Sequence, residues 1–146
     1  MSHIYLLIFH LFAAAIWTGG HLVLATRILP KALTERNADP ILAFERAFEP
    51  LGLAALVVLA VTGVLLALDF GDVATWFSAV DGIQKAVLLK LGLLLVTVLL
   101  ALHGRLRLIP RVRNDRLGPL AWHIVSVTAV GVALVVGGVL FRIGGL

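Results

Sequence analysis

The sequence predicts an all-α protein, a four-helix up-down bundle that spans a membrane. Of its 146 residues, 61% are hydrophobic and only 14% are charged. A soluble domain of this size does not need so much apolar surface, so the excess is expected to face lipid. Four apolar runs, at about residues 4–29, 51–68, 83–106 and 120–141, can each cross a hydrocarbon layer of ~30 Å. We find neither strand-like alternation nor an internal repeat, so residues 1–146 are expected to form one membrane domain.

Prolines and capping residues set the expected bounds of the first two spans. Ser2 is a candidate N-cap for the first span, and Pro30 is expected to bend or end it. Pro50 is expected in the first turn of the second span. Before it, Asp39 and Pro40 should begin a short amphipathic helix that lies on the membrane surface. The apolar face of that helix would consist of Ile41, Leu42, Phe44 and Phe48.

The two connections that follow the first and third spans carry most of the positive charge. They hold nine of the twelve Lys and Arg residues: Arg27, Lys31, Arg36, Arg46, Arg105, Arg107, Arg111, Arg113 and Arg116. The positive-inside rule places both connections in the cytoplasm and both termini outside, as in a multi-pass protein of a bacterial-type inner membrane. The net charge of +4 therefore indicates topology rather than nucleic-acid binding. In the outer connection, residues 69–82, Trp76 and Phe77 suit an interfacial anchor.

Composition excludes several kinds of metal site. The chain has no cysteine, and its single methionine is the first residue. Disulfides, iron–sulfur clusters and thiolate or thioether metal sites are therefore excluded. No Asp or Glu lies within an expected span, which argues against a proton-driven carrier.

Three histidines from three expected spans share one depth. Counted from the span centres, His21, His103 and His123 lie roughly 10–12 Å toward the cytoplasm. Ionisable groups at such depths are candidate site residues, because they are costly in hydrocarbon without a partner. His103 and His123 lie near helix ends, however, and could instead reach the interface. The pair Gly19-Gly20 before His21 would let a neighbouring helix or a flat ligand approach closely.

A second candidate layer lies in the outer half of the expected bundle. His10 and Lys90 fall roughly 6–8 Å toward the outside. On the first span, His10, Trp17 and His21 lie within roughly 40° of one another, so they share a helix face. Each has a structural alternative: His10 could bond a carbonyl, Lys90 could extend outward, and Trp17 could pack in the core. His3, at the outer end, is expected to be solvated.

Haem b is the ligand that these layers favour, because it needs histidine ligands and an apolar slot, and basic groups often meet its propionates. Spans one and three should be diagonal, roughly 12–14 Å apart, which leaves room for a porphyrin. His21 with His103 is thus one expected axial pair, with His123 nearby and Arg27 or Arg105 on the propionates. Alternatively, the haem lies between His10 and Lys90, with Lys85 or Arg142 as charge partners.

The function expected from such a haem is electron transfer or another oxidoreductase reaction, with a redox partner that the sequence does not identify. Two alternatives remain open. The chain could bind or transport copper through His21, His103 and His123, or it could be a structural subunit without a cofactor. Small residues in the fourth span, Gly131 and Gly137-Gly138, could support a homodimer within the lipid bilayer.

Several motifs resemble the copper resistance protein D (CopD-type) membrane family. They are Trp17-Thr-Gly-Gly20, the segment that reaches Pro30, Thr62-Gly63-Val-Leu, Leu88-Leu-Lys90-Leu-Gly and Arg105-Leu-Arg-Leu-Ile-Pro110. Their order covers most of the chain. The resemblance implies a membrane protein connected with copper, although the chain lacks internal methionines and cysteines.

A more distant resemblance is to HemJ-type protoporphyrinogen oxidases, which are small helical membrane proteins that bind haem b. It is carried by His10 with Trp17 seven residues later, and by Lys90-Leu91 in the third span. The resemblance implies that His10 is a haem ligand and that Lys90 belongs to the redox or substrate site.

Overall fold

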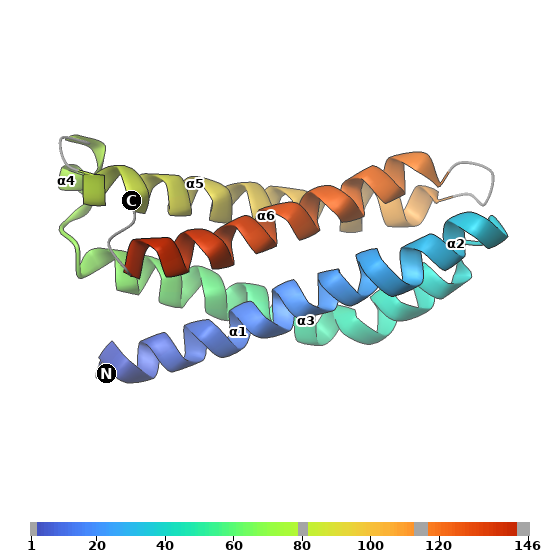
Figure 1. The fold of residues 1–146 in the computed structure, drawn as a ribbon, viewed down its shortest axis with the longest axis horizontal. Coiled ribbons are helices and arrows are strands. Elements are labelled where there is room, and N and C mark those ends of the chain that lie inside the picture. Colours follow the sequence, from blue (N-terminus) through green and yellow to red (C-terminus); the bar gives the residue numbers. More distant parts are fainter. Residues whose placement is uncertain (1–2, 79–81, 113–116, 143–146) are drawn as a thin grey trace.

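The computed structural model describes residues 3–78, 82–112 and 117–142, which form four long helical segments side by side (Figure 1). The elements are α1 (His3–Val23), the π-helical turn η1 (Leu24–Ile28), α2 (Leu29–Glu35), α3 (Asp39–Leu68), the short α4 (Val73–Ser78), α5 (Gly82–His103), the π-helical turn η2 (Gly104–Leu108), the 3₁₀ turn η3 (Ile109–Arg111) and α6 (Gly118–Arg142). The four long segments are long and apolar enough to cross a membrane. The predicted all-α fold with four spanning helices is confirmed, whereas its orientation stays a prediction.

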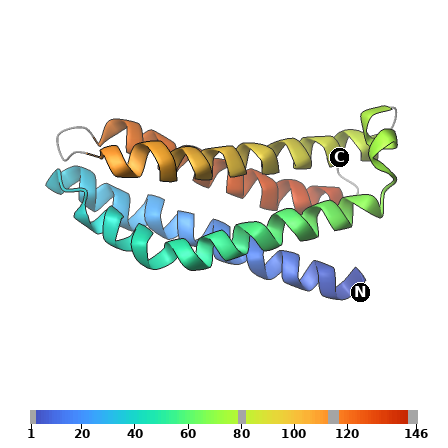
Figure 2. The ribbon, with the colours of Figure 1, turned by 180° about the vertical axis from the view of Figure 1, so that it is seen from behind.

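The bundle has two ends of different character. α1 begins and α6 ends at one end, beside α4 (Figures 1 and 2). At the other end α2 leads into α3, and η3 leads toward α6; we call this the basic end. Six of the predicted basic residues lie in helical elements there, and Arg36 lies in the turn between α2 and α3. Arg113 and Arg116 lie outside the described residues, as do Ser2 and the side chain of Arg142.

The helices are arranged so that the first and third spans lie diagonally. α1 packs mainly on α3 and α6, and α5 packs mainly on α6 and α3. The predicted diagonal relation of spans one and three is therefore confirmed. Large apolar side chains cover the outside, with Trp122 76% and Phe12 67% exposed, as expected for helices that face lipid. His3 was expected to be solvated. Its side chain is about half exposed, and its Nε2 lies 3.0 Å from Oδ2 of Asp69.

The prediction of a separate helix before Pro50 is wrong. α3 begins at Asp39 and continues to Leu68 with Pro50 inside it. Ile41 is only 1% exposed and packs against Leu24 and Leu120 in the core of the basic end. Because this burial holds the first turns of α3 in the bundle, the one backbone hydrogen bond lost at Pro50 does not end the helix. The residues expected on the membrane surface therefore belong to the bundle.

Two further local predictions need correction. Trp76, expected as an interfacial anchor, is 5% exposed and packs with Ala67 and Val87, whereas the neighbouring Phe77 is 74% exposed.

In α6, Gly131 faces α1, because a Cβ there would lie 3.2 Å from Oγ1 of Thr18. It is therefore used for packing inside the bundle. Gly137 and Gly138 have open space around them, and the homodimer stays a prediction.

The first and third spans share one local feature, a widened turn directly before a proline. In the first, the N–H of Leu29 donates to the carbonyl of Leu24, five residues back, directly before Pro30. In the third, the N–H of Ile109 donates to the carbonyl of Gly104, also five residues back, directly before Pro110. Proline lacks an N–H and its ring crowds the preceding turn, so the turn widens. The matching sequences are Arg27-Ile-Leu-Pro-Lys31 and Arg107-Leu-Ile-Pro-Arg111.

Candidate functional site

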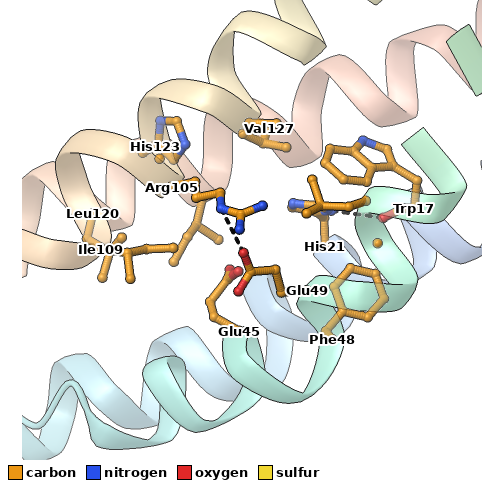
Figure 3. Close-up of a pocket in the computed structure, with 15 residues that line it drawn as sticks. Trp17, His21, Glu45, Phe48, Glu49, Arg105, Ile109, Leu120, His123 and Val127 are labelled. Carbon is orange, nitrogen blue, oxygen red and sulfur yellow. Dashed lines mark hydrogen bonds and ion pairs between the residues drawn. The ribbon is translucent and has the colours of Figure 1, made fainter. Parts of the chain in front are cut away.

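A pocket of about 80 Å³, which we call the inner pocket, lies toward the basic end and draws side chains from all four long segments (Figure 3). Its lining consists of Trp17 and His21 from α1; Glu45, Phe48, Glu49, Gly52 and Leu53 from α3; Ala101, Gly104, Arg105 and Ile109 from the third segment; and Leu120, His123, Ile124 and Val127 from α6. Four predicted site residues therefore meet here: Trp17, His21, Arg105 and His123.

His21 has its ring fixed by its own helix. Nδ1 of His21 donates to the carbonyl of Trp17 at 2.9 Å, and the two rings lie 4.4 Å apart between centroids. Since a carbonyl only accepts, the proton of neutral His21 is on Nδ1, and Nε2 keeps its lone pair. An imidazole held by one nitrogen with the other free is the usual state of a metal-ligating histidine.

Two carboxylates face the histidines from α3. Glu49 Oε1 lies 2.9 Å from Nε of Arg105. Glu45, one turn earlier, is half-buried and has no hydrogen bond or ion pair with another described residue. In Figure 3 both carboxylates point toward the Arg105 guanidinium, which lies between the rings of His21 and His123. The pocket thus combines two imidazoles, two carboxylates and one guanidinium.

The carboxylates were missed by sequence reasoning, because the start of α3 was expected outside the bundle. A signal was available in the spacing. Ile41, Glu45 and Gly52 recur at intervals of four and seven residues, so they lie on one helix face. Since Ile41 and Gly52 are both buried, that face is the one that packs in the bundle.

Small residues make room for the rings of the pocket. A Cβ at Gly104 would lie 2.6 Å from Nε2 of His123, so the glycine admits that imidazole. A Cβ at Gly20 or Gly52 would lie within 2.7 Å of the Phe48 ring. The space predicted beside Gly20 for a flat ligand is therefore filled by Phe48.

His103 lies apart from His21. Its side chain is exposed, and it lines a second cavity together with Arg107 and Arg111. Only its ring contact with His123, at 5.4 Å between centroids, connects it to the inner pocket. The structure therefore does not bring the expected axial pair, His21 and His103, into one cavity. His103 is the last residue of α5 and directly precedes η2.

His10 and Lys90 lie in the other half of the bundle. The hydroxyl of Thr62 donates to the carbonyl of Val58 at 2.5 Å and accepts from Nδ1 of His10 at 2.8 Å. Nζ of Lys90 lies 4.0 Å from the centroid of the Phe141 ring. Each of the two residues also lies twenty residues before a proline, Pro30 for His10 and Pro110 for Lys90. Of the other predicted charge partners, Arg27 and Lys85 are exposed.

Haem b does not fit the inner pocket. Pockets that hold a cofactor measure roughly 300–1,000 Å³, well above the volume of this one. Nor is a metal cluster preassembled: within residues 3–78, 82–112 and 117–142, no three His, Asp or Glu side chains are close enough to hold an ion together. The donor types nevertheless suit copper, for which imidazole and carboxylate are both ligands.

A family model described as copper resistance protein D matches residues 42–141. The chain belongs to the copper resistance protein D family. The match covers α3, α5 and α6 and so includes Glu45, Arg105 and His123, whereas α1 with His21 precedes it. No curated protein and no solved structure matches the chain. The predicted family is thus confirmed and points to copper, while the likeness to HemJ-type protoporphyrinogen oxidases stays a prediction.

Proposed function

We propose that this copper resistance protein D family member binds a copper ion in the inner pocket. The ligands are Nε2 of His21, the imidazole of His123 and the carboxylate of Glu45, with Glu49 as a further oxygen donor. One observation carries the proposal: His21, whose Nδ1 carries the proton, and the Glu45 carboxylate, which has no ion pair among the described residues, line the same pocket as a second histidine.

The donors favour Cu(II) over Cu(I). Thiolate and thioether ligands select Cu(I), and the chain contains no cysteine and no methionine beyond the first residue. Imidazole and carboxylate suit Cu(II), which also binds such ligands more tightly than other divalent first-row metals do. Two carboxylates would balance the charge of the ion in a site that helices partly shield from water.

Copper binding requires a rearrangement in the pocket. Arg105 occupies the space between the imidazoles, and its pairing with Glu49 satisfies one carboxylate. The ion must therefore displace the guanidinium, which is 52% exposed and can turn toward water. Arg105 thus acts as a built-in competitor of the metal.

We also propose that the pocket is loaded from the basic end. The partly exposed Arg105 side chain marks the more accessible side.

Equilibrium titration of the purified protein with Cu(II), against a competing chelator, tests the proposal. We expect one high-affinity site in the wild type. His21→Ala and Glu45→Gln should each weaken Cu(II) affinity by more than roughly 10–100-fold, which is the loss typical when a residue that only orients a metal ligand is removed. His3→Ala, at the opposite end, is the control and should bind as the wild type does. Unchanged affinity in both pocket variants, or the visible spectrum of a stoichiometric haem, would overturn the proposal.

A further inference from the structure

A second, larger cavity lies at the basic end, outside the inner pocket. It measures about 620 Å³ and is formed where η2 and η3 meet the start of α6. Its lining residues include Arg107, Arg111 and His103, together with apolar side chains such as Leu108 and Leu120. Nothing in the copper proposal uses this cavity.

The two arginines of this cavity have no partner among the described residues. Neither makes a hydrogen bond or an ion pair there, and the described residues of the lining include no acidic side chain. Two other basic residues at this end do have a carboxylate partner: Arg105 pairs with Glu49 at 2.9 Å, and Lys31 with Glu35 at 3.9 Å. Arg107 and Arg111 are four residues apart and belong to the same cavity. Such a pair of free guanidinium groups is suited to an anionic group with several oxygens.

The depth of the cavity indicates that the anion is part of a lipid. α5 has 22 residues, which at 1.5 Å per residue span roughly the ~30 Å thickness of the hydrocarbon. The residues after His103 therefore lie at the level of the headgroups. The apolar part of the lining would contact the first atoms of the acyl chains, and basic pockets between helices at this level are typical headgroup sites.

The two proline turns differ in what surrounds them. At the equivalent place after Pro30, the chain continues as α2, and Leu29 and Ala32 pack in one cluster with Ile41 and Leu120. After Pro110 the helix stops at Arg111, and the arginines of the second turn border the cavity.

We propose that this cavity binds the phosphate headgroup of an anionic phospholipid through Arg107 and Arg111, with His103 as a third polar contact. The bound lipid lies next to the inner pocket, because His103 contacts His123 and Leu120 lines both cavities.

Native mass spectrometry of the full-length protein, in detergent with added phosphatidylglycerol, tests this site. The wild type should retain one phosphatidylglycerol more tightly than phosphatidylcholine. An Arg near anionic lipid contributes on the order of 1 kcal/mol, so each of Arg107→Gln and Arg111→Gln should weaken retention by about fivefold, and the double variant by more. The matched control is Arg27→Gln with Lys31→Gln, at the equivalent positions of the first helix pair. This control should retain the lipid, and helicity should be the same in all variants.

Three outcomes would overturn the lipid site. Equal loss in the control and in the Arg107/Arg111 double variant would show only general attraction to a basic surface. Equal retention of phosphatidylcholine would show that the phosphate charge is not selected. Binding of inorganic phosphate alone at the same residues, with displacement of phosphatidylglycerol, would assign the cavity to a free anion. Because these measurements contain no copper, they are independent of the copper site.

Discussion

At the scale of single residues, the copper proposal depends on the state of His21. Its Nδ1 proton is held by the Trp17 carbonyl, so the nitrogen that faces a ligand is already deprotonated. Sequence reasoning selected His21 and His123 from their depth and Arg105 as a charge partner for propionates. It paired His21 with His103, which the structure places in a different cavity, because counting depth along a helix does not say which way a side chain points. It could not include Glu45, whose helix was expected on the membrane surface.

Removing the competing cation should strengthen copper binding. Arg105→Gln leaves Glu49 without its guanidinium partner and removes a positive charge beside the ion. We expect the affinity for Cu(II) to rise roughly tenfold, because the variant removes the repulsion between one nearby positive charge and the ion in a partly exposed site. The control is Arg46→Gln, an exposed arginine of α3 that does not line the pocket. Weaker binding in the Arg105 variant would mean that Arg105 supports the site.

A methyl group at residue 104 should disturb the pocket from the backbone side. In Gly104→Ala the new Cβ would lie 2.6 Å from Nε2 of His123, so the imidazole must move. Cu(II) affinity should fall by roughly tenfold, and the midpoint of thermal unfolding should also fall. Gly92→Ala is the matched control, since nothing lies within 4 Å of its added Cβ, and it should bind copper normally. Normal copper binding in both variants would place His123 outside the site.

At the scale of elements, the positions of prolines explain both the successes and the failures of prediction. Pro30 and Pro110 each follow a widened turn in the structure. The third segment ends directly after Pro110, at Arg111, whereas α2 continues past Pro30 to Glu35. Pro50 was expected to begin a helix but lies inside α3. The sequence around Pro50 contains no signal that separates the two cases. The difference arises from tertiary packing, because Ile41 is buried against two other helices.

The proline inside α3 should lower the stability of the bundle. Pro50→Ala restores the N–H that can donate to the carbonyl of Arg46, and it removes a steric conflict in the same turn. We expect a gain of about 1–3 kcal/mol, seen as a higher midpoint of thermal unfolding in detergent. Pro119→Ala, in the first turn of α6, is the control and should bring no such gain, because an N–H there has no partner in the helix. An unchanged or lower midpoint for Pro50→Ala would contradict this account.

At the scale of the whole molecule, composition alone predicted the class of fold. The length of the apolar runs determined the number of spans, and the short connections determined that they alternate in direction. The similarity of the turns at Pro30 and Pro110 extends over only five residues around each proline, so it does not make a repeat of the whole helix pair. The polar residues of the two halves differ, with carboxylates and imidazoles toward the basic end and an imidazole with an ammonium in the other half. We therefore expect the halves to have separate roles.

Copper should reach the pocket from one side of the membrane. In liposomes that contain the protein in a single orientation, Cu(II) added on the side of the basic end should load the site, while Cu(II) on the other side should not. The reason is that the Arg105 side chain, which lines the pocket toward the basic end, is 52% exposed and so marks the accessible side. The readout is quenching of Trp17 fluorescence, compared with the His21→Ala variant. Equal loading from both sides would contradict the proposed route.

The central claim, a copper site with one imidazole from α1 and one from α6, is tested most directly by electron paramagnetic resonance of the Cu(II)-loaded protein. We predict coupling to two imidazole nitrogens in the wild type and in His103→Ala. Coupling to a single imidazole is predicted in His21→Ala and in His123→Ala. A spectrum that loses a nitrogen in His103→Ala but is unchanged in His21→Ala would contradict the account.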